Sequence, residues 1–163
     1  MKEQPMTRIV VGIDGSHSSI AALHWAAIEA TSTGSILELI MAWEWPMDLG
    51  WSTILPADYN PEATAHQILD EVEERVREMH GDVQMRSSLI HGQASSTLVE
   101  ASWGAALLVV GNRGHGEFVG MLLGSVSEHC VAHAHCPVLV FHFQEQRTEQ
   151  HCVETYPGVQ ADG

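Results

Sequence analysis

Short apolar runs alternate along the chain with longer segments in which apolar residues recur at helical spacing. The runs are rich in β-branched residues and carry few charges, as expected for parallel strands that are covered on both faces. The strongest example is Arg8 to Ile13 (RIVVGI), and the weakest is 83–89, which alternates only partly. The pattern predicts five strands, at residues 8–13, 36–43, 83–89, 105–110 and 137–143.

The segments between these runs have the signals of helices. Ser16 or Ser18 can cap the first helix, Gly34 can end it, and Pro61 suits the first turn of the second. Strands and helices that alternate at this spacing predict an α/β fold, a five-stranded doubly wound parallel sheet with right-handed crossovers. We expect one domain over residues 1–144 and a flexible polar tail over 145–163. The predicted helices run from Ser16 or Ser18 to about 33, and over 61–80, 94–103 and 125–134.

A glycine-rich segment follows the fourth predicted strand and reads GNRGHGEFVGMLLGSV over residues 111–126. Its glycines permit a close backbone approach, and the helix expected after Gly124-Ser125 adds unpaired N–H groups and a positive dipole end. Neither GxxxxGK[ST] nor GxGxxG is present in it. We interpret Gly111-x2-Gly114-x9-Gly124-Ser125 as a phosphate cradle; the alternative is that the glycines only end a strand and begin a helix.

Three strand ends carry candidate binding groups. They are Asp14-Gly15-Ser16, Ala42-Trp43-Glu44 and Gly111-Asn112-Arg113. In an open parallel sheet, ligands bind beyond the carboxyl ends of the strands, where the strand order reverses. Asp14 could serve only as a helix cap, and Arg113 could be a solvated surface cation.

Composition narrows the function classes. The 163 residues have a formal net charge of −14, which argues against general binding to nucleic acid or anionic membranes. No apolar run approaches the roughly 20 residues that cross a bilayer, and the first residues do not resemble a secretory signal. Three cysteines, an odd number, fit a reducing compartment. We therefore expect a cytoplasmic location.

With these motifs the chain resembles the universal stress protein family, in its nucleotide-binding branch. The resemblance covers about residues 8–143 and rests on VGIDGS at 11–16, on the long glycine motif, and on AHCPVLV at 134–140. It implies a Rossmann-like fold similar to that of the adenine nucleotide alpha hydrolases. It also implies ATP as the ligand, with Mg²⁺ as a possible companion, and a homodimer formed through the final strand, Val138 to Phe143.

The resemblance also implies a role for each site residue. Asp14 would lie by the adenine or ribose, Gly12 would allow close approach, and Ala42 would offer backbone groups to the adenine edge. Glu117 departs from the family pattern, which often has a small residue at this position. A carboxylate there would repel the phosphates unless a divalent cation or the side-chain rotamer relieves the repulsion. The residues expected around the ribose and phosphates are Gly111, Asn112, Arg113, Gly114, His115, Gly116, Glu117, Gly124, Ser125 and Val126.

Two further groups of residues invite a function. His129, Cys130, His133, His135 and Cys136 resemble a metal cluster, but a closed zinc site needs four convergent ligands, and this spacing does not predict one. Trp43, Trp45 and Trp51 either cover the nucleotide or a partner, or pack over the sheet edge.

The sequence supports three functional hypotheses. The leading one is an ATP-dependent regulator of an unknown protein partner with at most slow hydrolysis, because no general base or arginine finger is evident. The alternatives are an ATP-using transferase or pyrophosphatase, and an interaction module without nucleotide.

Overall fold

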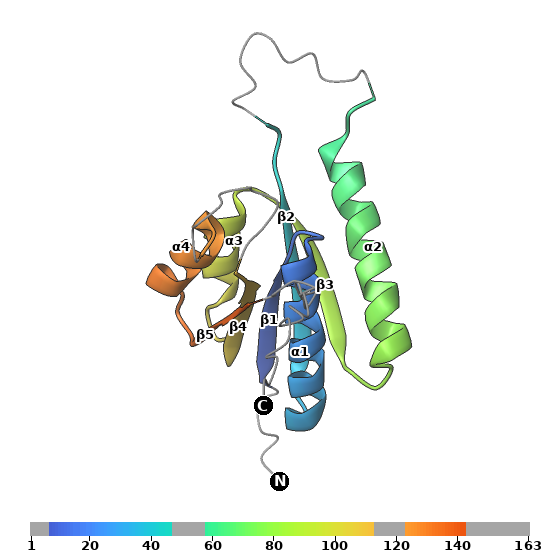
Figure 1. Cartoon of the computed structure of the whole chain (residues 1–163), viewed down its shortest axis with the longest axis vertical. Coiled ribbons are helices and arrows are strands. Elements are labelled where there is room, and N and C mark those ends of the chain that lie inside the picture. The colour runs from blue at the N-terminus through green and yellow to red at the C-terminus, as the bar shows by residue number, and fades with distance from the viewer. Residues whose placement is uncertain (1–6, 47–57, 113–122, 143–163) are drawn as a thin grey trace, which may run out of the picture.

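The computed structural model describes residues 7–46, 58–112 and 123–142 of the chain (Figure 1). Several residues singled out above lie outside these ranges. They are Arg113 to Glu117, Trp51, and the proposed tail, which includes Cys152.

The centre of the molecule is a parallel sheet of five strands in the order β3-β2-β1-β4-β5. This confirms the predicted doubly wound α/β architecture. From β1, the sheet continues through β2 and β3 on one side and through β4 and β5 on the other. The strand order therefore reverses between β1 and β4. The strands are β1 Arg8–Ile13, β2 Ile36–Trp43, β3 Met85–His91, β4 Leu107–Gly111 and β5 Val138–Phe141.

Within the described ranges, four helices cover the two faces of the sheet (Figure 1). They are α1 His17–Thr33, α2 Pro61–Met79, α3 Ala94–Ala101 and α4 Ser125–His133.

Alternate residues of the central strands divide the core into two layers. Val11 packs with Leu23 of α1 and Leu69 of α2, whereas Val10 packs with Leu98 of α3 and Cys130 of α4. Burial on both faces explains why the central strands read as nearly unbroken apolar runs. It follows that α1 and α2 lie on one face, and α3 and α4 on the other.

The ends of α1 and α2 follow the chemistry expected from the sequence. The side chain of Ser16 accepts a hydrogen bond from the Ser19 N–H at the start of α1, and that of Asn60 accepts one from Ala63 at the start of α2. Gly34 ends α1 with a φ of 66°, a left-handed conformation that favours glycine. In α2, Leu69, Val72 and Val76 are buried, but Met79, which continues their helical spacing, is 59% exposed in the last turn.

Strand β3 begins two residues later than the sequence predicts. The predicted first residue, Val83, instead donates its N–H to the His80 carbonyl, 3.0 Å away, in the turn that follows α2. Pairing with β2 sets the true start, because Met85 lies opposite Leu37. As an edge strand, β3 is partly exposed along its whole length, which explains its weak apolar pattern.

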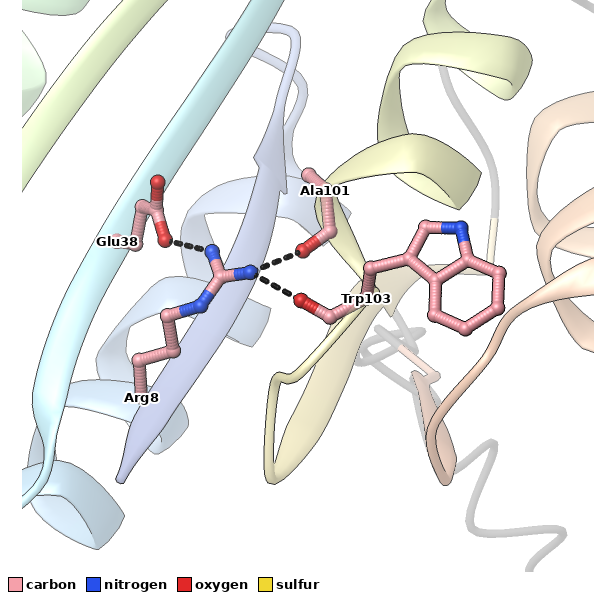
Figure 2. Close-up of polar contacts among 4 residues, drawn as sticks. All are labelled: Arg8, Glu38, Ala101 and Trp103. Carbon is pink, nitrogen blue, oxygen red and sulfur yellow. Dashed lines mark hydrogen bonds and ion pairs between the residues drawn. The ribbon is translucent and has the colours of Figure 1, made fainter. Parts of the chain in front are cut away.

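Arg8 ties three elements together at the end of the sheet where the strands begin (Figure 2). Its guanidinium forms an ion pair with Glu38 of β2 and donates to the carbonyls of Ala101 and Trp103 at the end of α3. A planar group with several fixed donors is suited to bridging a carboxylate and two carbonyls at once.

Among the helices that the structure describes, none is long and apolar enough to cross a membrane.

Candidate functional site

The candidate site lies at the carboxyl ends of β1 and β4, where the strand order reverses. Val11 pairs with Val109, and both strands end two residues later, at Ile13 and Gly111. The chain then leaves β1 for α1 on one face of the sheet, while the chain after β4 returns through α4 on the other. The main chain therefore diverges here, as it does at the ligand-binding edge of other doubly wound sheets.

Gly111 allows the start of α1 to pack directly on the end of β4. A Cβ on this glycine would lie 2.5 Å from Oγ of Ser18 and 2.8 Å from its carbonyl carbon. Such distances are far inside van der Waals contact, and a backbone atom cannot move away as a side chain can. Packing against Ser18 therefore requires a glycine at position 111, independently of any ligand at this edge of the sheet.

Gly12 also has a packing reason that the sequence analysis did not foresee. A Cβ at this position would lie 2.8 Å from Cδ1 of Leu98 on α3. The space opened by this glycine is therefore filled by a core side chain. Its predicted role in the approach of a nucleotide stays a prediction.

Asp14 stabilises the turn between β1 and α1. Its Oδ1 accepts hydrogen bonds from the Ser16 N–H at 2.9 Å and from the Ser16 hydroxyl at 2.5 Å. Ser16 in turn accepts from the N–H of Ser19 at 3.3 Å and so caps α1. These contacts give Asp14 a local structural role at the predicted edge, and its role beside an adenine or ribose stays a prediction.

Asn112 and Gly124 close the base of the glycine-rich segment. The Asn112 N–H donates to the Phe141 carbonyl of β5 at 2.9 Å, and the Gly124 N–H donates to the Asn112 carbonyl at 2.7 Å. Asn112 is buried, with 8% of its surface exposed. The residues on either side of 113–122 are therefore anchored to each other and to the sheet.

Helix α4 starts at this anchored base without a side-chain cap. Gly124 is the N-cap residue, with φ −77° and ψ 163°, and in the described part of the chain no side chain bonds to the helix start. Ser125 is the first helical residue, which matches the predicted start of this helix, and it is exposed. Val126 is partly buried against the core. An uncapped helix start presents backbone N–H groups to an anion.

Ser127 is a structural residue of this site that the sequence analysis missed. Its buried hydroxyl donates to the Gly111 carbonyl at 2.7 Å and lies 3.4 Å from the carbonyl oxygen of Asn112. This contact joins the first turn of α4 to the end of β4. No pattern in the sequence distinguishes it from the other serines.

Aromatic rings gather at the carboxyl ends of β2 and β3, beside Ala42. The Trp43 ring lies 4.6 Å from that of His91, and Trp45 lies edge-on between Trp43 and Tyr59, with ring centroids 6.5 and 6.3 Å away. Trp43 and Trp45 thus pack together over the ends of these strands, although Trp45 remains 48% exposed.

The cluster of histidines and cysteines is divided by the fold. Cys130 is fully buried, and burial raises the pKa of its thiol to about 11. Burial also raises the pKa of Cys136, against smaller opposing effects of a hydrogen bond to Leu108 and of Arg8. The His135 ring instead stacks on Trp103 at 3.6 Å. Across the described ranges, no group of three or more His, Cys, Asp or Glu residues is placed to hold a metal ion.

Comparison with known proteins agrees with this architecture. The model of the Universal stress protein family matches residues 6–142. A universal stress protein of Mycobacterium tuberculosis strain H37Rv is 34% identical over 144 residues, which are 85% of this chain and 49% of the relative. The chain thus spans about half the length of the curated relatives it matches.

Two solved structures are informative as neighbours. A universal stress protein in complex with cAMP has a TM-score of 0.61 and 30% identity, with 83% of this chain and 96% of that chain covered. A family protein of Arabidopsis thaliana with AMP bound has a TM-score of 0.60 and 19% identity, with 89% and 97% covered, and shows the fold alone. The extent of the family match and the identity to these relatives establish that the chain belongs to the universal stress protein family.

Proposed function

We propose that this protein binds ATP at the carboxyl edge of β1 and β4 and acts as a nucleotide-dependent regulator. The observation that carries the proposal is the start of α4, which no side chain of the described residues caps and which the Gly124–Asn112 hydrogen bond holds against the sheet. Phosphate oxygens are the natural acceptors for N–H groups at such a helix start. A related structure that contains cAMP supports an adenine nucleotide as the ligand class.

The phosphates would lie beside Gly124 and contact the N–H groups of Ser125 and Val126 and the Ser125 hydroxyl, because the Gly124 N–H already donates to the Asn112 carbonyl. The remaining predicted contacts, Gly111 to Glu117, would surround the ribose and phosphates, with Mg²⁺ offsetting the carboxylate of Glu117. The base would lie toward Asp14 and Ala42, at the neighbouring ends of β1 and β2. In this arrangement, main-chain groups do most of the binding.

The hydrogen bonds of Asp14 favour a regulatory role over ATP hydrolysis. This carboxylate, which the sequence places in the site, already accepts two hydrogen bonds from Ser16. Its Oδ1 thus holds the turn that begins α1, a structural role that supports binding over general-base catalysis at this position. We therefore propose that ATP occupancy, with at most slow hydrolysis, controls the binding of a protein partner in the cytoplasm.

We also propose a homodimer through the final strand, residues 138–143. Strand β5 is an edge of the sheet, and all four of its residues are partly exposed. An apolar edge strand leaves N–H and C=O groups that a second copy can pair. Sedimentation of the purified protein tests this: a monomer at micromolar concentration contradicts it.

The nucleotide proposal is tested by calorimetric titration of ATP into wild-type protein and into Gly124→Val. The backbone angles of Gly124 are open to any residue, so the variant should fold while its side chain blocks the phosphates. We expect at least about a tenfold loss of affinity, because each hydrogen bond to a charged group contributes about 1.5–3 kcal/mol. Val131→Ala, at an exposed position of the same helix, is the matched control and should bind as wild type.

Two results would contradict the proposal. Equal affinity of wild type and Gly124→Val would show that the phosphates bind elsewhere. Rapid ATP turnover by the wild-type protein would favour the alternative of an ATP-using enzyme.

A further inference from the structure

His129 and His133 form a close pair on the surface of α4. Their ring centroids lie 4.4 Å apart with an interplanar angle of 48°, and both residues are exposed. They are one helical turn apart, so their side chains leave the same face of the helix. Cys130, in contrast, faces the core.

Two imidazoles at this spacing make a chelating unit. Imidazole nitrogen is a preferred ligand for Cu²⁺, Ni²⁺ and Zn²⁺, and the same i, i+4 spacing on a helix carries the two histidines of many zinc sites. The helix already holds the rings side by side, so little side-chain freedom remains to be lost on binding.

The neighbouring histidine and cysteine do not add ligands to this pair. His135 is stacked on Trp103, and Cys130 is buried in the core, where it cannot reach an ion on the exposed face of the helix. A metal held by two histidines keeps coordination positions for water or for a donor from another molecule. The arrangement therefore differs from the closed four-ligand cluster that the sequence analysis weighed.

We infer that His129 and His133 together bind one divalent transition-metal ion, with Cu²⁺ bound more tightly than Ni²⁺ or Zn²⁺. The ion links two successive turns of α4 and sits on its exposed face, away from the helix start that Gly124 forms. The site is therefore independent of the nucleotide site proposed above.

Titration of the full chain with Cu²⁺ in the presence of free glycine as a competing ligand tests this inference. We expect one strongest site, and electron paramagnetic resonance should show two nitrogen ligands. His129→Gln or His133→Gln should each weaken that site roughly a hundredfold, because binding through two linked ligands becomes binding through one. Both positions are exposed, so the variants should melt as wild type does without metal.

A spacing control separates this pair from the other histidines of the chain. The double variant Val131→His/His133→Gln keeps the number of histidines but puts the second ring two positions from His129, on another face of the helix. Val131 is 54% exposed and should tolerate the change. We expect the control to bind as weakly as His133→Gln. Retention of the strongest site in the control or in either single variant would overturn the inference, as would its absence from the wild-type protein.

Discussion

Ser18 lies so close to Gly111 that a Cβ on the glycine would stand 2.8 Å from the Ser18 carbonyl carbon. We expect Gly111→Ala to lower the free energy of unfolding by about 2 kcal/mol, because α1 must move away from β4. Urea denaturation measures the effect. Gly12→Ala is the comparison: its nearest contact is the flexible end of Leu98, so its cost should be smaller. Equal stability of the two variants would show that the close contact between Gly111 and the Ser18 backbone does not determine the cost of the added Cβ.

Ser127 should contribute to stability through its bond to the Gly111 carbonyl. Replacing it with alanine removes a buried hydrogen bond and should cost about 1–2 kcal/mol. Ser125→Ala, two positions earlier and exposed, should change stability by less than about 0.5 kcal/mol. Chemical denaturation of both variants checks this pair of values. Equal effects would mean that the Ser127 contact adds no stability.

The Arg8 contacts should be worth more than an ordinary surface ion pair. Arg8 and Glu38 have side chains that are 30% and 21% exposed, and Arg8 also bonds to two carbonyls of the α3 end. We expect Arg8→Met to lower the free energy of unfolding by about 1–3 kcal/mol.

Arg77→Met supplies the matched control for Arg8. Arg77 pairs with Glu73 along α2 and is 64% exposed, so its loss should cost at most about 0.5 kcal/mol. A comparable loss in the two variants, measured under the same conditions, would argue against the bridging role of Arg8.

Acidification should weaken the contact between α1 and α2 at His24. The His24 Nδ1 lies 3.4 Å from Nε2 of His80. Burial, followed by the positive charges of His80 and Arg75, lowers the pKa of His24 in the folded protein. The unfolded chain therefore binds a proton more readily, so this contribution is present above the ordinary histidine pKa and is lost as the pH falls through the folded value.

The pH dependence is measured by urea denaturation at about pH 7.5 and about pH 5.5, a range in which histidines change charge. Wild type should lose more stability between the two conditions than His24→Gln does. His66→Gln, an exposed change on α2, should keep the wild-type dependence. The account of His24 is wrong if His24→Gln and wild type respond alike.

The sequence predicted the order of the elements well because burial on both faces leaves a strong signal. The bounds of β1 and β2 match the prediction, since these strands are apolar along their length, whereas the central strand β4 begins at Leu107, two residues after its predicted start. The edge strand β3 was placed two residues early, because partly exposed residues carry a weaker pattern and pairing with β2 decides the start. Met79 continues the helical spacing of Val72 and Val76 but is exposed, because helical spacing gives the face of a residue and not how far the core beneath it extends.

For the candidate site, sequence predicted the strand ends but not what fills the space around them. A glycine that admits a ligand and one that admits a neighbouring side chain look alike in a sequence, and only the position of Leu98 distinguishes them at Gly12. Ser127 was missed because its partner, the Gly111 carbonyl, is a backbone group far away in the chain. The predicted contacts from Arg113 to Glu117 lie outside the part of the chain that the structure describes.

The most direct measurement is a titration of isotope-labelled protein with ATP, followed through the backbone amide resonances. The account predicts the largest shifts at the amides of Ser125 and Val126, with smaller ones at Asp14 and Ala42. Shifts that concentrate elsewhere on the molecule, or none with ATP in large excess, would contradict it.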